Sequence, residues 1–382
     1  MYVLGRDTDS AGGAGAAGTS DASGTSDDGR LPTVRLGSFR ARDGSAGAAV
    51  GLDADGPHAG VVFGKRGTGK SYTLGVIAEG LAANRGVAPV VIDPMGVFGG
   101  LRAVGGRVVE PRVRPAAIPP DAWPDLLSLD PAGGPGSLVW RVVADAFDAA
   151  GDGGSEQATG SPSLATLRER VDAADAPAAD RRAAANHLRL AASWGVFDAD
   201  APPIARFAAD GNPTVLDLAG APEPAAAAVV RAVARALYDA RIDGEIDRLP
   251  WLLVDEAHAF FGGVADPALR TLLTRGRAPG VSLVCATQRP GAVPSVAVSQ
   301  SDLVVAHRLT AERDRDRLAE AEASYLAGDL VSRLPTGTGE ALVVDDATET
   351  AHTVRVRERR TPHGGGSPRA SEAAASKPED PR

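Results

Sequence analysis

Lysine and cysteine are the residues that this sequence has least of. Its 382 residues include three lysines (Lys65, Lys70 and Lys377) and one cysteine, Cys285. A single cysteine excludes an internal disulfide and a cysteine metal cluster, and the apolar run Val281–Thr287 around it indicates a buried small hydrophobe. Aromatic residues make up only 4% of the chain, so its core must be built mainly from aliphatic side chains.

Long apolar runs and net positive charge are also missing. No apolar run reaches the length of a membrane span, and the first residues lack the basic-then-apolar pattern of a signal peptide. We therefore expect a cytoplasmic protein without a membrane span. The formal net charge is −9, which indicates no general affinity for nucleic acid but leaves room for local basic patches.

The two ends of the chain contain little that a core could bury. Residues 1–30 are mostly Gly, Ala, Ser, Thr and Asp, and residues 362–382 have a similar composition. We expect both ends to be disordered tails that flank one domain at residues 31–361.

Between these tails, short apolar runs alternate with helical stretches. Strands are expected at residues 59–63, 88–92, 214–218, 251–254, 281–286 and 302–307, and helices at 71–84, 222–242 and 267–275. Strands that are apolar throughout are typical of a parallel sheet covered on both faces, so the pattern predicts an α/β fold with a mainly parallel, doubly wound sheet.

Two segments depart from this alternation. Residues of about 110–210 combine Pro-rich and Gly-rich stretches with helical patterns at 163–174 and 178–194, and are predicted to form a mainly helical insertion. Alternating apolar residues at 341–344 and 353–356 predict a C-terminal β-hairpin.

The segment Gly64–Ser71 (GKRGTGKS) matches the phosphate-binding pattern G-x-x-x-x-G-K-[ST] between an expected strand and an expected helix. Glycines let backbone N–H groups turn toward phosphates, and the helix N-terminus attracts their charge. Lys70 is expected to reach the β- and γ-phosphates, and Ser71 to ligate Mg²⁺. The expected nucleotide contacts are Gly64, Lys65, Arg66, Gly67, Thr68, Gly69, Lys70, Ser71 and Tyr72.

Two adjacent carboxylates follow the apolar run Trp251–Val254. Asp255 is expected to hold magnesium, and Glu256 to polarise the water that attacks the γ-phosphate. A helix N-cap is the plainer interpretation, but a position downstream of a phosphate loop favours catalysis. Gln288, at the end of a later strand, is placed to sense the γ-phosphate or to orient water, because ligands of parallel sheets bind at the carboxyl ends of strands.

Six segments resemble, in their order and content, the HerA/FtsK-type P-loop ATPases, and especially their HerA-like branch. They are GKRGTGKS, VVIDPMGVFGGL, WLLVDEAHAFF, RGRAPGVSLVCATQRP, SQSDLVVAHRLT and RTPHGG, within residues of about 34–99 and 212–365. The resemblance implies a RecA-like core that binds ATP and Mg²⁺, assembles into hexameric rings and moves double-stranded DNA, in some members together with a nuclease.

The resemblance also assigns roles to two arginines. Arg277 matches the family arginine before the Gln-bearing strand and is therefore a candidate arginine finger, whereas by position alone it is a solvated side chain. Arg308 matches a second arginine at the subunit interface. The string Asp255–His258 (DEAH) resembles a DEAH-box helicase as well, but no second RecA-like core follows. His258 is therefore interpreted as structural, or as a link between the nucleotide and a neighbouring subunit, rather than as catalytic.

Two features depart from the HerA-like pattern. These proteins commonly have an N-terminal β-barrel before the phosphate loop, whereas residues 31–60 suffice for one hairpin. Val97 stands where family members often have Glu. The missing barrel puts the partnership with a nuclease in doubt.

The leading hypothesis is a ring-forming ATPase that acts as a DNA translocase or helicase. The alternative is a non-DNA ATPase that remodels a protein partner or a secretion-type assembly, which the acidic net charge favours. A nucleotide-gated binding module without turnover is a third class, against which Glu256 argues. Candidate DNA contacts are the basic residues Arg102, Arg107, Arg112, Arg114 and Arg189.

Overall fold

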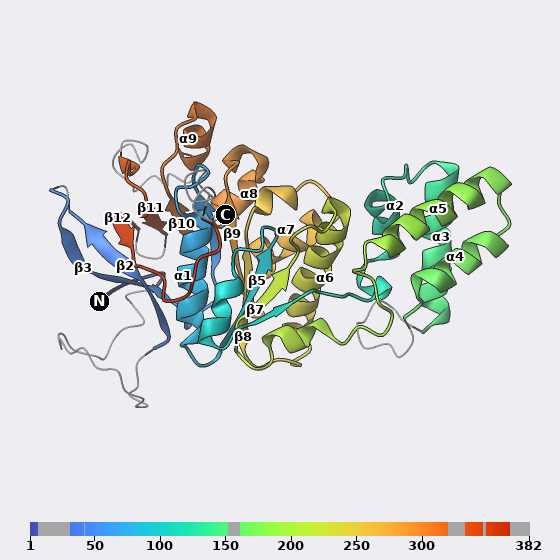
Figure 1. Ribbon diagram of the computed structural model, residues 1–382, viewed down its shortest axis with the longest axis horizontal. Coiled ribbons are helices and arrows are strands. Elements are labelled where there is room, and N and C mark those ends of the chain that lie inside the picture. The colour runs from blue at the N-terminus through green and yellow to red at the C-terminus, as the bar shows by residue number, and fades with distance from the viewer. Residues whose placement is uncertain (7–30, 42, 152–160, 320–332, 347–348, 367–382) are drawn as a thin grey trace, which may run out of the picture.

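The computed structural model describes residues 1–6, 31–41, 43–151, 161–319, 333–346 and 349–366. Its strands join into one twelve-stranded sheet with the order β1-β3-β2-β12-β11-β10-β4-β9-β8-β5-β7-β6. Figure 1 shows a β-hairpin at one end of the molecule and a group of helices at the other. Most of the two predicted tails, residues 7–30 and 367–382, lies outside the described residues.

The half of the sheet from β10 to β6 is entirely parallel. Phe63 is in register with Thr287 on one side and with Ala306 on the other. Val254 is in register with Cys285. These strands therefore end close together, and the residues that follow them share one edge of the sheet. The strands are β4 (Ala59–Phe63), β5 (Val87–Asp93), β6 (Arg107–Val109), β7 (Thr214–Asp217), β8 (Leu249–Val254), β9 (Ser282–Thr287) and β10 (Leu303–Ala306).

The other half of the sheet is built from both ends of the chain. β11 (Glu340–Asp345) pairs antiparallel with β10 and with β12 (Thr350–Val356), which confirms the predicted C-terminal hairpin. β12 pairs with β2 (Thr33–Arg40), and β2 pairs antiparallel with β3 (Ala46–Asp53), so one hairpin precedes β4 as expected.

A further strand, β1 (Tyr2–Leu4), pairs parallel with Val50–Leu52 of β3. It lies in the segment predicted to be a disordered tail, and for these three residues that prediction is wrong. Leu4 is fully buried, so its burial and the pairing with β3 hold the segment in place. Three apolar residues are too short a run to indicate a strand from the sequence alone.

Helices cover both faces of the parallel half, which confirms the predicted doubly wound α/β sheet. On one face, α1 (Lys70–Ala82) shares a core with Val62, and on the other, α6 (Glu223–Ile242) and α7 (Asp266–Arg275) share a core with Phe63. Successive residues of a strand point to opposite faces, so strands that are apolar throughout fill both cores. Two shorter helices complete this part: α8 (Ser295–Ser299) and α9 (Glu312–Ala319).

Between β6 and β7 the chain leaves the sheet and forms helices with a core of their own. Trp123, Leu167 and Leu188 are fully buried in that core. Figure 1 shows these helices projecting from the sheet, in the segment predicted as an insertion. They are α2 (Trp123–Leu126), α3 (Gly134–Ala149), α4 (Leu164–Ala173) and α5 (Ala178–Ser193). α3 is absent from the expected helices because it begins with Gly-Pro-Gly, a sequence typical of loops.

Candidate nucleotide site

The loop between β4 and α1 turns sharply because two of its glycines have positive φ. Gly67 has φ 77° and Gly69 has φ 117°, in the region that favours glycine. Thr68 closes the turn, because its N–H and its hydroxyl both donate to the Lys65 carbonyl, at 3.2 and 2.8 Å. Lys65, Arg66 and Gly67 are exposed at the rim of the loop.

Lys70 lies inside this loop, with only 5% of its surface exposed. Its ammonium donates to the Lys65 carbonyl at 3.3 Å. Burial lowers the pKa of Lys70, and the nearby carboxylates of Glu256 and Asp255 oppose that shift. A buried ammonium with one neutral acceptor is suited to bind phosphate oxygens, which would compensate its lost hydration.

Ser71 and Asp255 bring a hydroxyl and a carboxylate together from elements far apart in the sequence. Ser71 Oγ donates to Asp255 Oδ2 at 2.7 Å. Asp255 is 1% exposed, and burial raises its pKa to about 6. Magnesium takes oxygen ligands, and a divalent charge here would favour the ionised carboxylate. The donor set therefore fits Mg²⁺.

Glu256 follows Asp255 in a left-handed backbone conformation, with φ 47° and ψ 38°. Such a conformation costs a non-glycine residue roughly 1–3 kcal/mol and is concentrated at functional sites. Its buried Oε2 makes no hydrogen bond within the described residues and lies 3.3 Å from Nδ1 of His258. Burial lowers the pKa of His258, so this imidazole is neutral at neutral pH. The carboxylate of Glu256 is thus available to a water molecule.

Gln288 directly follows β9, which lies between the phosphate-loop strand β4 and the carboxylate strand β8. Because Thr287 is in register with Phe63, the last residue of β4, Gln288 stands level with the start of the phosphate loop. Its side chain is half-buried. The sheet order therefore brings Gln288 to the same edge as Lys70 and Glu256.

The two arginines singled out by family resemblance lie at different edges of the sheet. Arg277 is exposed in the turn that leads into β9, which is the edge opposite the phosphate loop. The length of strand β9 therefore separates Arg277 from the phosphate loop of its own chain. Arg308 follows β10 and is exposed, and its carbonyl accepts a hydrogen bond from Lys65 N at 3.1 Å.

His307 has no role in the sequence analysis, yet it braces the phosphate loop. It is fully buried, and burial lowers its pKa to about 4, so the ring is neutral. Its Nδ1–H donates to the Glu340 carbonyl at 2.9 Å, which leaves Nε2 to accept from the Thr73 hydroxyl, also at 2.9 Å. A Cβ at Gly64 would lie 2.8 Å from Cβ of His307, so histidine and loop are in contact. The one signal in the sequence was a histidine ending an apolar strand.

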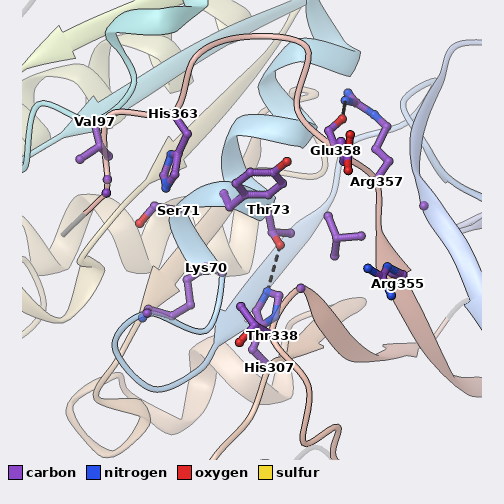
Figure 2. Close-up of a pocket in the computed structure, with 18 of the residues that line it drawn as sticks. Lys70, Ser71, Thr73, Val97, His307, Thr338, Arg355, Arg357, Glu358 and His363 are labelled. Carbon is purple, nitrogen blue, oxygen red and sulfur yellow. Dashed lines mark hydrogen bonds between the residues drawn. The ribbon is translucent and has the colours of Figure 1, made fainter. Parts of the chain in front are cut away.

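A cavity of about 810 Å³ opens beside the start of α1 and includes Lys70, Ser71 and Glu256 in its wall. Tyr72 also lines it, and its hydroxyl accepts a hydrogen bond from Arg359 N at 2.6 Å. Figure 2 shows His363, from the last described segment, pointing toward Ser71. The predicted nucleotide contact Tyr72 thus lies between the phosphate loop and the C-terminal segment.

The arginines predicted to contact DNA have mixed surroundings. Arg107 forms an ion pair with Asp210 at 2.9 Å, and Arg114 donates to the Ala201 carbonyl at 2.6 Å. Arg107 thus links β6 to the end of the insertion, whereas Arg114 links two segments within the insertion. Three others are exposed: Arg102, Arg112 and Arg189.

The model of one protein family, described as the central domain of the helicase HerA, matches residues 34–237. The match includes the phosphate loop and covers more than half of the chain. The chain belongs to the HerA family. No curated protein matches this HerA-family chain. None of the helices in its described part is both long enough and apolar enough to cross a membrane.

Among the solved structures that resemble this HerA-family chain in fold are a VirB4 protein and a conjugative coupling protein. VirB4 of Thermoanaerobacter pseudethanolicus aligns with a TM-score of 0.65 and 18% identity, over 87% of this chain and 98% of that one. The bacterial conjugative coupling protein TrwB aligns with a TM-score of 0.57 and 15% identity, over 83% of this chain and 88% of that one. At such identities the likeness concerns the fold, and it confirms the predicted RecA-like P-loop ATPase core.

Proposed function

We propose that this HerA-family chain hydrolyses ATP and uses the energy to move along double-stranded DNA as one subunit of a hexameric ring. The observation that carries the ATPase part is the meeting of three groups at one sheet edge. They are the buried ammonium of Lys70, the Ser71–Asp255 pair, and the Glu256 carboxylate oxygen that makes no hydrogen bond within the described part of the chain.

Hydrolysis breaks the bond between the γ-phosphorus and the bridging oxygen, while a water oxygen attacks the phosphorus. Glu256 accepts the proton of that water, and Gln288 orients it. Lys70 neutralises charge that develops on the phosphate oxygens, which is most effective in a buried site. Ser71 and Asp255 would hold Mg²⁺, which would supply further positive charge to the phosphates.

The position of Arg277 supports assembly into a ring. Arg277 lies at the sheet edge opposite the phosphate loop of its own chain. If it is an arginine finger, it must therefore act on the site of a neighbouring subunit. Arg277→Ala should then leave ATP binding unchanged and lower turnover in the assembled protein by about 10³-fold or more. Equal turnover in the variant and the wild type would remove Arg277 from this role.

Two observations support the DNA part of the proposal. The matching family is described as the central domain of a helicase, and the fold is shared with a conjugative coupling protein. The net charge of −9 means that DNA must be bound by local basic residues, such as the exposed Arg102 and Arg112. Remodelling of a protein or a secretion-type assembly is the alternative.

The test is steady-state ATP turnover in Mg²⁺ buffer, with and without double-stranded DNA, over a series of salt concentrations. Glu256→Gln keeps the size of the side chain and should abolish turnover. Glu169→Gln, at an exposed position of α4, is the matched control and should match the wild type. DNA stimulation that weakens steeply with salt supports the DNA motor. Turnover that ignores DNA at every salt concentration favours the remodelling alternative.

A further inference from the structure

The last described residues, Arg357–Gly366, are here called the C-terminal strap. The strap leaves β12, crosses the outer side of α1, and ends in the cavity beside the phosphate loop (Figure 2). Nothing in the ATPase mechanism above uses it. Its contacts nevertheless show that it is held in place by buried charges rather than lying loosely on the surface.

The anchor of the strap is Glu79, a carboxylate on α1 that is 4% exposed. It accepts hydrogen bonds from Thr361 Oγ1 at 2.6 Å, from Thr361 N at 3.0 Å and from Arg360 N at 3.1 Å. Arg357 Nη1 pairs with it at 2.8 Å and Arg359 Nε at 3.3 Å. Burial alone would raise the pKa of Glu79, but these hydrogen bonds lower it to about 2.

Arg359 connects Glu79 to His363 at the cavity. Its side chain is 1% exposed, and its guanidinium lies over the rings of Tyr72 and Phe98. Nη1 donates to Nδ1 of His363 at 3.1 Å. Because a guanidinium can only donate, Nδ1 of His363 must be the acceptor and the ring proton lies on Nε2. The ring of His363 stands at 82° to that of Tyr72, with centroids 5.4 Å apart.

The loop after β5 forms the facing wall. Asp93, 1% exposed, accepts hydrogen bonds from Val97 N at 3.0 Å and Phe98 N at 2.8 Å, which fixes this loop. Gly364 N donates to the Val97 carbonyl at 3.3 Å, so strap and loop are joined. Val97 and the exposed Met95 line the cavity together with His363 and Tyr72. The result is two aromatic rings and two apolar side chains next to Lys70 and Ser71.

We propose that this aromatic and apolar part of the cavity, formed by Tyr72, Val97, Met95 and His363, binds the base and ribose of the nucleoside triphosphate. The inference rests on the proposed ATPase function. A triphosphate in the phosphate loop has its nucleoside attached at its outer end, and this surface adjoins the loop in one continuous cavity. The flat faces of bases stack on aromatic side chains in a way that a bare phosphate chain cannot. His363 is thus a binding residue supplied by the strap.

The experiment compares two probes, Mg²⁺-ATP and Mg²⁺-tripolyphosphate, by isothermal titration calorimetry on the full chain. His363→Ala should weaken ATP binding about tenfold, the scale of one lost stacking contact, and leave tripolyphosphate binding unchanged. His363→Phe restores a flat ring and should recover most of the ATP affinity. Lys70→Ala should weaken both probes. Arg360→Ala removes an exposed strap side chain and serves as the control.

The outcomes separate this inference from the proposed function. If the wild type binds neither probe, the ATPase proposal fails and the base site fails with it. If the wild type binds both probes and Lys70→Ala weakens both, but His363→Ala binds ATP as well as the wild type, the base site alone is overturned. An equal loss of both probes in His363→Ala would also overturn it, because the histidine would then act on the phosphates.

Discussion

The two halves of the sheet contribute to the site in different ways. The parallel half, from β10 to β6, supplies Lys70, Asp255, Glu256 and Gln288 from loops that follow neighbouring strands. The antiparallel half supplies none of these groups, but its last strand, β12, leads into the C-terminal strap. The proposed hydrolysis thus depends on parallel strands that end at the same level of the sheet. The proposed contact with the nucleoside depends instead on the C-terminal strap, which packs against α1 from a distant part of the sequence.

The largest expected effect on activity comes from Lys70→Ala, a change in the parallel half. The loss of a buried cation that faces the developing charge should lower ATP turnover by about 10³-fold, and unfolding stability should change little. Steady-state phosphate release and urea denaturation measure the two effects. A variant that keeps a tenth of the wild-type rate would contradict the role of Lys70.

The corresponding change for the C-terminal strap, which continues from the antiparallel half, is Glu79→Ala on α1. It leaves Arg357 and the buried Arg359 without their carboxylate, so the free energy of unfolding should fall by about 3 kcal/mol, the scale of a broken buried ion pair. Urea denaturation monitored by circular dichroism measures it. Glu358→Ala, at an exposed position of the strap, is the matched control. Equal stability of the two variants would show that Glu79 does not anchor the strap.

His307→Ala tests the contact between the halves, since this residue joins the phosphate loop to β11. The Thr73 hydroxyl loses its acceptor and a void opens beside Gly64, so stability should fall by about 1–3 kcal/mol. ATP affinity should fall as well, and His307→Asn should restore part of both. Because the pKa of His307 is about 4, the loss of affinity should be the same at every pH between 5 and 8. A loss that changes across this range would contradict a neutral histidine.

The smallest expected effect is the pH dependence of the strap. The pKa of Glu79 is about 2 in the folded chain and 4.5 ordinarily, so its stabilisation is complete above pH 4.5 and declines as pH falls toward 2. The difference in unfolding free energy between wild type and Glu79→Gln should therefore shrink from pH 5 to pH 2.5. A difference that stays constant over this range would contradict the lowered pKa.

Much of the fold could be predicted because its signals are local. Residues 59–63 form β4 as expected, and the strands expected near 88–92, 214–218, 251–254, 281–286 and 302–307 are present within about two residues of the predicted ends. Each is an unbroken apolar run bounded by turn residues. Among the elements that were not predicted, α3 begins with Gly-Pro-Gly, and β1, β6, α2 and α8 have only three to five residues each, too few for a periodic signal.

The phosphate loop and the Asp255–Glu256 pair were determined by the sequence itself, because each lies within one short segment whose spacing is the signal. The tertiary structure alone decided that Glu79 anchors the strap and that His307 braces the phosphate loop. These relations join residues up to hundreds of positions apart. Such contacts depend on strand order and packing, which no local pattern of residues encodes.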